Sequence, residues 1–482
     1  MYSKLMLITT LAACRSSAPQ PQVGLPRCEA VASGAPRAPL REPVHAPGPT
    51  IAADDVRADF AGWMSQLAEL HPDLLLRTDM PAFERTRAEI AASITGPMTQ
   101  REAWLLFARL NPTLRDGHSG VQMPDRTALV QAHLDAGGRL FPFAVHLAAD
   151  GRLRVHDAGG GAHGIARGDR IVAINGRSAD EVVAELLALT GGDTLAFRRE
   201  LLARRFQIYY WLKYGDTHDY AITVEPRDGC PRELTLPGAA VLPAGRPLAV
   251  RAAEAFSYRI LDGGIGYLKA GDFGPEYADA LAAFARRAFA AFKATGIRAL
   301  IIDVRDNGGG DDPLWQQHLM EYVTTRTYTH VGRYAVRVNK DNADPGDVIG
   351  EVQRRENKRT FTPSPDNPLR FEGPVYVLAG TFTYSSAIQF LVAAQDFGIA
   401  RIAGRETGGL SCQTGQVKRM AMPRTGLQAV TPVIAFIRPS GRGCDRGVVP
   451  DVVIDDDGLD PDRAPALLAK QILAAGVTPA AR

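Results

Sequence analysis

Between residues 54 and 110, apolar side chains recur every three or four positions, which is the spacing of amphipathic α-helices. Three such sets follow one another, and they begin at Phe60, Phe83 and Trp104. Before the third set, Thr99 and Glu102 have the spacing of a capping box, which indicates where that helix begins. We therefore expect a helical N-terminal domain over residues 54–125.

The pattern changes over residues 138–225, where short apolar runs alternate with Gly-Asp and Asn-Gly turns. The string GDRIVAINGRSADEV, a strand, a turn and the start of a helix, resembles the latter half of a PDZ domain. Such domains bind a peptide C-terminus as an added strand. A small β-domain without peptide affinity is the alternative interpretation of the same residues.

From about residue 250 the pattern becomes strand, helix, strand. Residues 298–304 (RALIIDV) form a near-continuous apolar run, as expected for a parallel strand that is covered on both faces. Residues 264–270 and 374–379 are two further predicted strands, and helical spacing separates the three. Alternating strands and helices predict an α/β core over residues 250–460.

The first 53 residues have the composition of targeting and tether segments. Lys4 is followed by an apolar run over residues 5–13 and then by Cys14, which predicts a secretory signal peptide over residues 1–14. The LAAC ending resembles a bacterial lipobox, so we expect Cys14 to be lipidated and to anchor the chain. An ordinary signal cleaved elsewhere is the alternative. Residues 15–53 are rich in Pro and Ala and predict a tether.

This signal places the protein in the bacterial cell envelope. Arg15, rather than an Asp, follows the cysteine, which favours the outer membrane, facing the periplasm, in a Gram-negative host. The charged residues nearly cancel, with 55 Lys and Arg against 53 Asp and Glu, so nucleic acid is a poor candidate partner. No apolar run reaches the roughly 20 residues that would span a bilayer. We therefore expect contact with the membrane only through the lipid anchor.

Export makes disulfide bonds possible among the four remaining cysteines, Cys28, Cys230, Cys412 and Cys444. Four cysteines allow three pairings. Cys412 and Cys444 flank what is predicted to be one β-hairpin, so we favour that pair. The sequence has no CxxC and no HExxH string, and its ten histidines are scattered, so we expect no metal and no other cofactor.

Two loops of the predicted α/β core could carry chemistry. The strand over residues 298–304 runs into Gly308, Gly309 and Gly310, whose backbone N–H groups could face an anion, although a glycine run can also be a simple turn. The strand over residues 374–379 runs into Ser385 and Ser386 at the start of a helix. A serine there can present its hydroxyl for attack, or it can simply cap the helix.

Three strings in order, DVRDNGGGD, TFTYSSAIQFLVAAQDFGIARIAGRETGG and GVVPDVVI, resemble the tail-specific and C-terminal processing serine peptidases, on the tricorn-core side. The resemblance covers most of residues 55–460. It implies a crotonase/ClpP-like spiral ββα catalytic core with a helical N-terminal domain and a PDZ-like β-domain. It also implies that Ser385 is the nucleophile.

The same resemblance suggests the other catalytic groups. Relatives with a Ser–Lys dyad have a lysine where this sequence has Leu410, so the base must lie elsewhere. The string DGHSG matches the tricorn-like branch and makes His118 the expected base. Asp445, just before the GVVPD string, is the candidate acid that orients His118, although relatives usually have Glu one residue earlier. The N–H groups of Ser386 and of Gly308 or Gly309 would hold the oxyanion.

We therefore expect an exported serine endopeptidase that hydrolyses unfolded or C-terminal segments of proteins. A catalytically silent envelope lipoprotein that binds peptides or other ligands on the same fold is the alternative. An acyl-CoA enzyme on a crotonase-like fold is disfavoured, because export would remove the protein from its cofactor.

Overall fold

The computed structural model describes residues 48–158, 162–242 and 252–476. The predicted signal peptide, most of the predicted tether, Cys14 and Cys28 lie outside these ranges. Within them, no helix is long and apolar enough to cross a membrane.

The first part of the chain is helical, as predicted. Its helices are α1 (Ala53–Leu70), α2 (Met80–Ser93), α3 (Gln100–Phe107) and the short α4 (Asn111–Leu114). The predicted capping box before α3 is confirmed: Thr99 accepts a hydrogen bond from the Glu102 N–H, and the Glu102 carboxylate accepts one from the Thr99 N–H. Two short strands, β1 (Thr50–Ile51) and β2 (Met98–Thr99), pair at the edge of this helical group.

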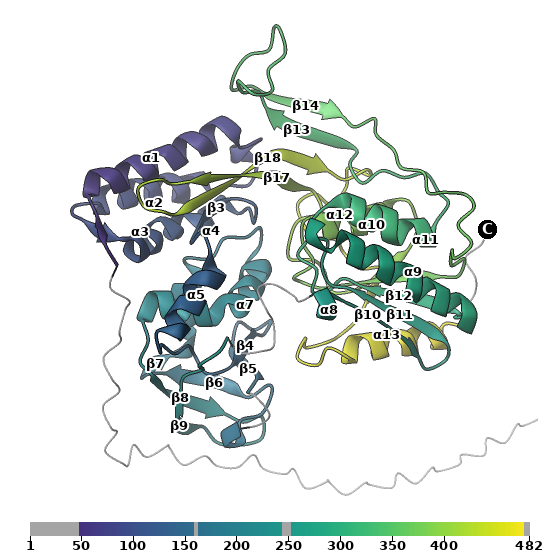
Figure 1. Ribbon diagram of the computed structural model, residues 1–482, viewed down its shortest axis with the longest axis horizontal. Helices are drawn as coiled ribbons and strands as arrows, with labels where there is room; N and C mark the ends of the chain where they lie inside the picture. The colour runs from purple at the N-terminus through teal and green to yellow at the C-terminus, as the bar shows by residue number, and fades with distance from the viewer. Residues whose placement is uncertain (1–47, 159–161, 243–251, 477–482) are drawn as a thin grey trace, which may run out of the picture.

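Below the helices in Figure 1 lies an antiparallel sheet with strand order β4-β5-β6-β8-β9. Its strands are β4 (Ala144–Leu147), β5 (Leu153–Asp157), β6 (Arg170–Ile174), β8 (Asp219–Glu225) and β9 (Arg232–Pro237), with the short β7 (Arg177–Ser178) beside β6. The helices of this region are α5 (Arg126–Asp135), α6 (Ala179–Leu187) and α7 (Leu195–Tyr214).

Helix α7 was not predicted from the sequence. Twelve of its 20 residues are buried, and they lie on every side of the helix rather than along one stripe. A helix that is covered all round shows no regular alternation of apolar and polar positions. Its first turn packs on the α/β core, while its later turns pack with the helices and sheet of the N-terminal part, so α7 joins the two halves of the molecule.

The predicted α/β class is confirmed by a sheet with strand order β10-β11-β12-β15-β16-β19. Its strands are β10 (Phe256–Leu261), β11 (Ile265–Ala270), β12 (Ala299–Asp303), β15 (Val375–Ala379), β16 (Arg401–Gly404) and β19 (Val452–Val453). All are parallel except the edge strand β10, which pairs antiparallel with β11.

Helices cover both faces of this sheet, as Figure 1 shows. They are α9 (Ala278–Thr295) and α12 (Ser386–Asp396) on one face and α13 (Arg463–Ala474) on the other, with the short α8 (Ala252–Ala255), α10 (Asp312–Trp315) and α11 (Glu321–Val323) nearby. Leu300 and Ile302 belong to the cluster that includes α9 and α12, whereas Ile301 belongs to the cluster that includes α13. All five residues of β12 are therefore buried, which explains its continuous apolar run.

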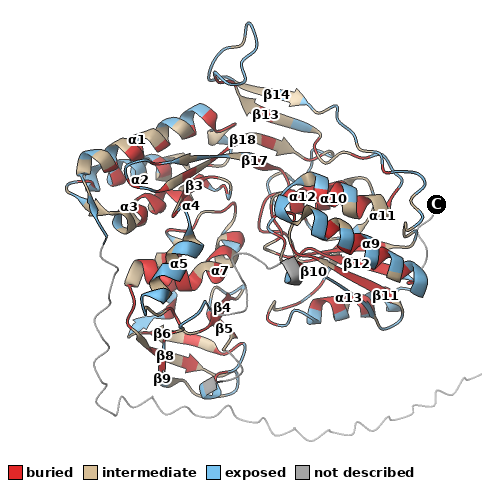
Figure 2. Cartoon of the chain, viewed as in Figure 1, coloured by how far each residue is buried: buried red, intermediate tan, exposed pale blue. Residues whose placement is uncertain are grey.

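A further sheet, with strand order β14-β13-β18-β17, spans the top of the molecule. Its strands are β13 (Arg333–Arg337), β14 (Val352–Glu356), β17 (Gln413–Ala421) and β18 (Gln428–Ile437), and β3 (Gly120–Gln122) also pairs with β18. At the tip of the β17–β18 hairpin, Asp59 of α1 accepts hydrogen bonds from the N–H groups of Arg424 and Thr425. Figure 2 shows buried residues in β3 and β18 along this bridge, which fixes the loop before β3 against the α/β core.

Candidate active site

Ser385 sits where the chain leaves β15 and begins α12. Its backbone has φ 54° and ψ −124°, a conformation that costs a residue with a side chain roughly 1–3 kcal/mol. Neighbouring contacts hold this turn in place: the Thr383 hydroxyl donates to the Val304 carbonyl at 2.8 Å, and the Gln413 amide donates to the Ser385 carbonyl at 2.8 Å. The strained turn lifts the Ser385 side chain away from the helix, where it lines a cleft.

His118 lies on the loop between α4 and β3, in the DGHSG string. Its Nε2 is 3.0 Å from Ser385 Oγ, so the structure brings together two residues that are 267 positions apart. The Asp116 carboxylate accepts a hydrogen bond from the His118 backbone N–H at 2.8 Å, which shapes the loop that presents the ring.

The second ring nitrogen of His118 faces two hydroxyl groups. Nδ1 is 3.1 Å from the Tyr384 hydroxyl and 3.4 Å from Thr414 Oγ1. The Tyr384 hydroxyl donates to Asp193 Oδ2 at 2.8 Å, and Thr414 Oγ1 donates to Asp116 Oδ1 at 2.8 Å. A neutral ring whose Nε2 is free to accept a proton carries its own proton on Nδ1, from which it can donate a hydrogen bond to these hydroxyl oxygens.

Asp445 is not near this ring. The residue is exposed and makes no contact with His118, so the structure contradicts the predicted role of Asp445 as orienting acid. The physical reason is the path of its loop: Ser411 N–H donates to the Arg446 carbonyl, and Leu410 pairs with Gly447, which holds this segment beside the residues before β17. Glu406 lies beside the same segment, because its carboxylate forms a surface ion pair with Arg446.

Three aromatic and imidazole rings form a stack beneath the serine. Tyr384 stacks on His118 with ring centroids 4.8 Å apart, and Phe197 of α7 stacks on the other face of Tyr384 at 4.2 Å. The stack fixes the plane of the imidazole, and it excludes water from Nδ1 because Tyr384 is buried.

Two buried carboxylates lie behind the stack, and their pKa values are shifted in opposite directions. Burial opposes ionisation of Asp116, but the hydrogen bond from His71 (3.1 Å) and the nearby positive charge hold the pKa of Asp116 below its usual range. Burial, and then the charge of Asp116, raise the pKa of Asp193 to about 6, although Arg77 opposes the shift. Asp116 is therefore ionised throughout the neutral range, whereas Asp193 titrates close to it.

The pKa of His118 is lowered, chiefly because burial disfavours the charged ring. The Asp116 carboxylate opposes this shift, and the positive charges of Arg77 and Arg419 add to it. His118 is consequently a neutral ring at pH 7 and can accept a proton from Ser385.

The glycine loop after β12 packs directly against the serine. A Cβ on Gly309 would lie 2.5 Å from the Ser385 Cβ, and its φ of +108° also requires glycine. The Gly309 N–H donates to Asn307 Oδ1 at 2.8 Å, so the prediction that Gly309 could hold an oxyanion is wrong, since its donor is already used. Gly308 and Ser386 both line the cleft, and among the described residues neither N–H has a hydrogen-bond partner.

These residues open into a cleft of about 1150 Å³ between the two halves of the molecule. The α/β core contributes the serine and the glycine loop, the N-terminal part contributes the His118 loop and α7, and β17 forms a third wall. Tyr384, Asp193 and Thr414 were missed by sequence analysis. Only Tyr384 had a signal, its position next to Ser385, because the other two reach the site solely through the tertiary fold.

Comparison with known proteins identifies the α/β core. Residues 264–454 match the sequence model of peptidase family S41. These residues form a domain of peptidase family S41. The protein is accordingly a serine-type peptidase, and the family expected from the three sequence strings is confirmed. A search of curated protein sequences gave no significant match.

Among solved structures, mature CPAF is similar to this S41 peptidase at 16% identity, over 89% of this chain and 99% of CPAF, with a TM-score of 0.62. Mature CPAF complexed with lactacystin is similar at 15% identity, over 88% of this chain and 99% of its own, with a TM-score of 0.62. At this level of identity the likeness shows a shared fold. It extends well beyond the S41 domain and includes the helical and β-rich parts of the N-terminal half.

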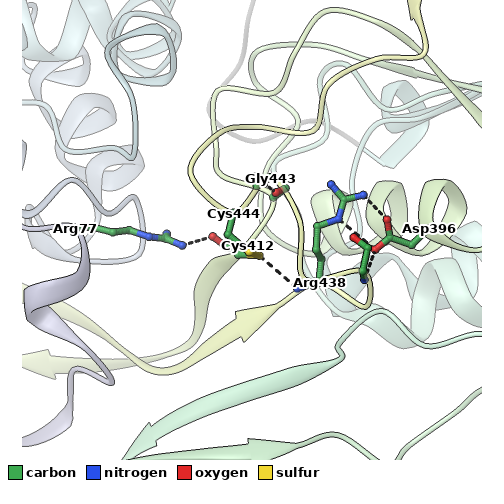
Figure 3. Close-up of a disulfide and its surroundings, with 8 residues drawn as sticks. Arg77, Asp396, Cys412, Arg438, Gly443 and Cys444 are labelled. Carbon is green, nitrogen blue, oxygen red and sulfur yellow. Dashed lines mark hydrogen bonds and ion pairs between the residues drawn. A yellow bond between two sulfur atoms is a disulfide. The ribbon is translucent and has the colours of Figure 1, made fainter.

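A disulfide bond lies next to the cleft that Ser385 and His118 line. Cys412 and Cys444 are bonded, as predicted, with a Cα–Cα distance of 4.7 Å. Figure 3 shows that Arg77 of the helical part donates to the Cys412 carbonyl, while Arg438 forms an ion pair with Asp396 at 2.5 Å on the other side. The bond therefore fixes the start of β17, whose next residues bind Ser385 and His118. The pair that is left over, Cys28 and Cys230, includes a residue outside the described ranges.

Proposed function

We propose that this S41 peptidase uses Ser385 as its nucleophile and His118 as its general base. The observation that carries the proposal is the 3.0 Å contact between His118 Nε2 and Ser385 Oγ, made by a serine on a strained turn. A nucleophile within hydrogen-bond reach of a neutral base, which is itself held in orientation, is the arrangement that covalent catalysis requires.

The reaction follows from this geometry in two halves. Ser385 Oγ attacks the carbonyl carbon of the peptide bond while its proton moves to His118 Nε2. The tetrahedral intermediate collapses when Nε2–H donates that proton to the leaving amine, which leaves an acyl group on Ser385. A water molecule, deprotonated by His118, then attacks the acyl carbon, and the proton returns to Ser385 Oγ as the new carboxyl end departs.

Negative charge on the tetrahedral oxygen needs donors, and the N–H groups of Ser386 and Gly308 are our candidates. Both residues line the cleft beside Ser385. The N–H of Ser386 opens helix α12, so the partial positive charge of that helix end adds to the attraction.

Two hydroxyl–carboxylate pairs take the place of a single orienting acid in this proposal. The imidazolium that forms during the reaction would donate Nδ1–H to the Tyr384 and Thr414 oxygens, and Asp193 and Asp116 polarise those hydroxyls. We regard these four as positioning residues, because none of them contacts the reacting atoms.

The substrate in this proposal is an extended segment of an unfolded protein or a protein C-terminus. Strand β17 ends its sheet and lines the cleft with residues 413–417, so a peptide could add beside it as a further strand. We also propose that residues 138–225 form a PDZ-like domain. This assignment is part of the same hypothesis as the nucleophile and oxyanion roles.

Export and anchoring also remain part of the proposal. Cys14 would carry lipid and hold the peptidase at the cell envelope, in the outer membrane facing the periplasm. Growth with labelled palmitate tests this: we expect label on the wild-type chain and none on Cys14→Ser, and an unlabelled wild-type chain would refute it.

Labelling with a fluorophosphonate tests the nucleophile. We expect one modified residue, Ser385, and complete loss of labelling in Ser385→Ala. Ser386→Ala is the matched control: its side chain binds Asp312 and Trp315 rather than facing the base, so labelling should persist. Modification at another residue would mean that Ser385 is not the nucleophile, and no modification of a correctly folded chain would favour the silent binding protein.

A further inference from the structure

Three arginines line the cleft that contains Ser385 and His118. Arg126 is the first residue of α5, Arg205 lies in the middle of α7, and Arg419 lies on β17. They come from three separate elements, and all three line the same cleft as the glycine loop.

None of these guanidinium groups is neutralised. Among the described residues, no carboxylate forms an ion pair with Arg126, Arg205 or Arg419. Arg126 makes one long contact, 3.4 Å, to the Gln122 amide oxygen, and Arg205 Nε is buried without a hydrogen-bond partner. The preceding residue, Arg204, differs: it pairs with Asp306 at 2.6 Å and with Glu200 at 3.3 Å.

Three carboxylates line the cleft, those of Asp125, Asp311 and Asp312, and two of them have partners of their own. Asp125 caps α5 through a 2.9 Å bond from the Ala128 N–H. Asp312 binds the Ser386 hydroxyl and pairs with His330 at 3.1 Å on the α/β side. None of the three pairs with Arg126, Arg205 or Arg419 among the described residues, so these arginines have no salt-bridge partner there.

Holding these groups together costs free energy. The positive charge of Arg205, and then burial, lower the pKa of Arg126 to about 10, and Arg419 adds to this shift. Arg126 and Arg205 are half-buried like charges with no ion-pair partner among the described residues, and Arg419 beside them is exposed. Such an arrangement is typical of a site that binds an opposite charge.

We propose that Arg126, Arg205 and Arg419 form a subsite that binds a carboxylate of the peptide substrate. Guanidinium groups bind carboxylates through paired, charge-assisted hydrogen bonds, and all three arginines line the cleft. The charge of Arg419 also acts on His118, so the subsite lies beside the catalytic pair. An acidic side chain and a free peptide C-terminus carry the same group, and the experiment separates them.

This subsite rests on the proposed peptidase function, so binding and hydrolysis are measured separately. Wild-type kcat/KM is compared for peptides that differ only by Glu against Gln, and for free against amidated C-termini. The same peptides are titrated into Ser385→Ala by fluorescence anisotropy. We expect about tenfold preference for the acidic side chain or for the free terminus, weakened by salt. Equal kcat/KM and equal Kd for all four peptides would overturn the subsite.

Charge variants give the decisive comparison. Arg126→Gln and Arg205→Gln should each remove about tenfold of the preference, and Arg287→Gln, an exposed arginine of α9 outside the cleft, should leave it unchanged. Arg205→Glu should shift the preference toward a Lys peptide. Since Arg126 and Arg205 repel each other, neither Gln variant should lower the melting temperature. A lowered melting temperature with unchanged preference would mean a structural role.

The two hypotheses fail in different ways. If the peptidase proposal is wrong, wild type hydrolyses none of the peptides, yet the anisotropy with Ser385→Ala still reports whether the arginines select a carboxylate. If only the subsite is wrong, wild type hydrolyses all of the peptides with no dependence on the carboxylate.

Discussion

The two halves of the candidate site are built in different ways. The half that carries the nucleophile comes from adjacent loops of one parallel sheet: Tyr384 N–H donates to the Asn307 carbonyl, and Gly309 packs on Ser385. The half that carries the base is assembled from the helical part, the loop before α7 and β17. Arg77 joins these pieces, since it pairs with Asp193 at 3.4 Å and donates to the Cys412 carbonyl.

Because they are built differently, the two halves of the site are expected to have different tasks. In the proposed mechanism the sheet loops fix where the attacking oxygen and the oxyanion lie, with one further hydrogen bond from Gln413 of β17 to the Ser385 carbonyl. The assembled half fixes the protonation and the orientation of one ring. Variants in the assembled half should therefore lower turnover while the strained serine turn stays intact.

The largest effect is expected from removing the base. His118→Ala should lower kcat by about a thousandfold or more, as loss of a triad base does in other serine enzymes. Because burial lowers the pKa of His118, the wild-type acidic limb should lie below pH 6.5, and steady-state rates from pH 4 to 8 would measure it. His163→Ala, at an exposed histidine, is the control. A wild-type profile without an acidic limb would contradict the assignment.

An intermediate effect is expected from Asp193→Asn, which weakens the acceptor of the Tyr384 hydroxyl. We expect kcat at pH 7.5 to fall about 10- to 100-fold, because removing one oriented hydrogen bond to a charged intermediate lowers kcat by about that factor.

Stability should change in the opposite direction. The pKa of Asp193 is raised from 3.8 to about 6, so its contribution to stability is present below pH 3.8 and is lost as the pH rises through 6. The melting temperature of Asp193→Asn relative to wild type should therefore increase between pH 4 and pH 7. A constant difference across that range would show that the carboxyl is not perturbed.

The smallest effect is expected from Thr414→Val. Its hydroxyl is 3.4 Å from His118 Nδ1, farther than the 3.1 Å of Tyr384, so the remaining hydroxyl should keep the ring oriented. We expect a loss of kcat of about threefold, against about tenfold for Tyr384→Phe. Thr431→Val is the matched control, because the buried Thr431 hydroxyl has no partner among the described residues. Equal losses for Thr414→Val and Thr431→Val would remove Thr414 from the site.

The sequence was informative where chemistry is local in the chain. The continuous apolar run of β12, the turn at Ser385 and the DGHSG string each identify a feature without knowledge of the fold. Asp193 could not be found in this way, because it reaches the ring only when α7 packs on the α/β core. The prediction that Asp445 orients His118 was wrong for the same reason. Its position in the sequence suggested that it lies near His118, but pairing of its loop with Leu410 keeps Asp445 at the surface. Helix α7 was missed because it is buried all round.

The distance along the chain between His118 and Ser385 also has a consequence for the newly made protein. A peptidase that acts on extended chains meets its own unfolded chain first. Until β3 has paired with β18 and α7 has packed on the core, Ser385 has no base and is an ordinary alcohol. Under the proposed mechanism, proteolysis therefore begins only after the chain has itself ceased to be a substrate.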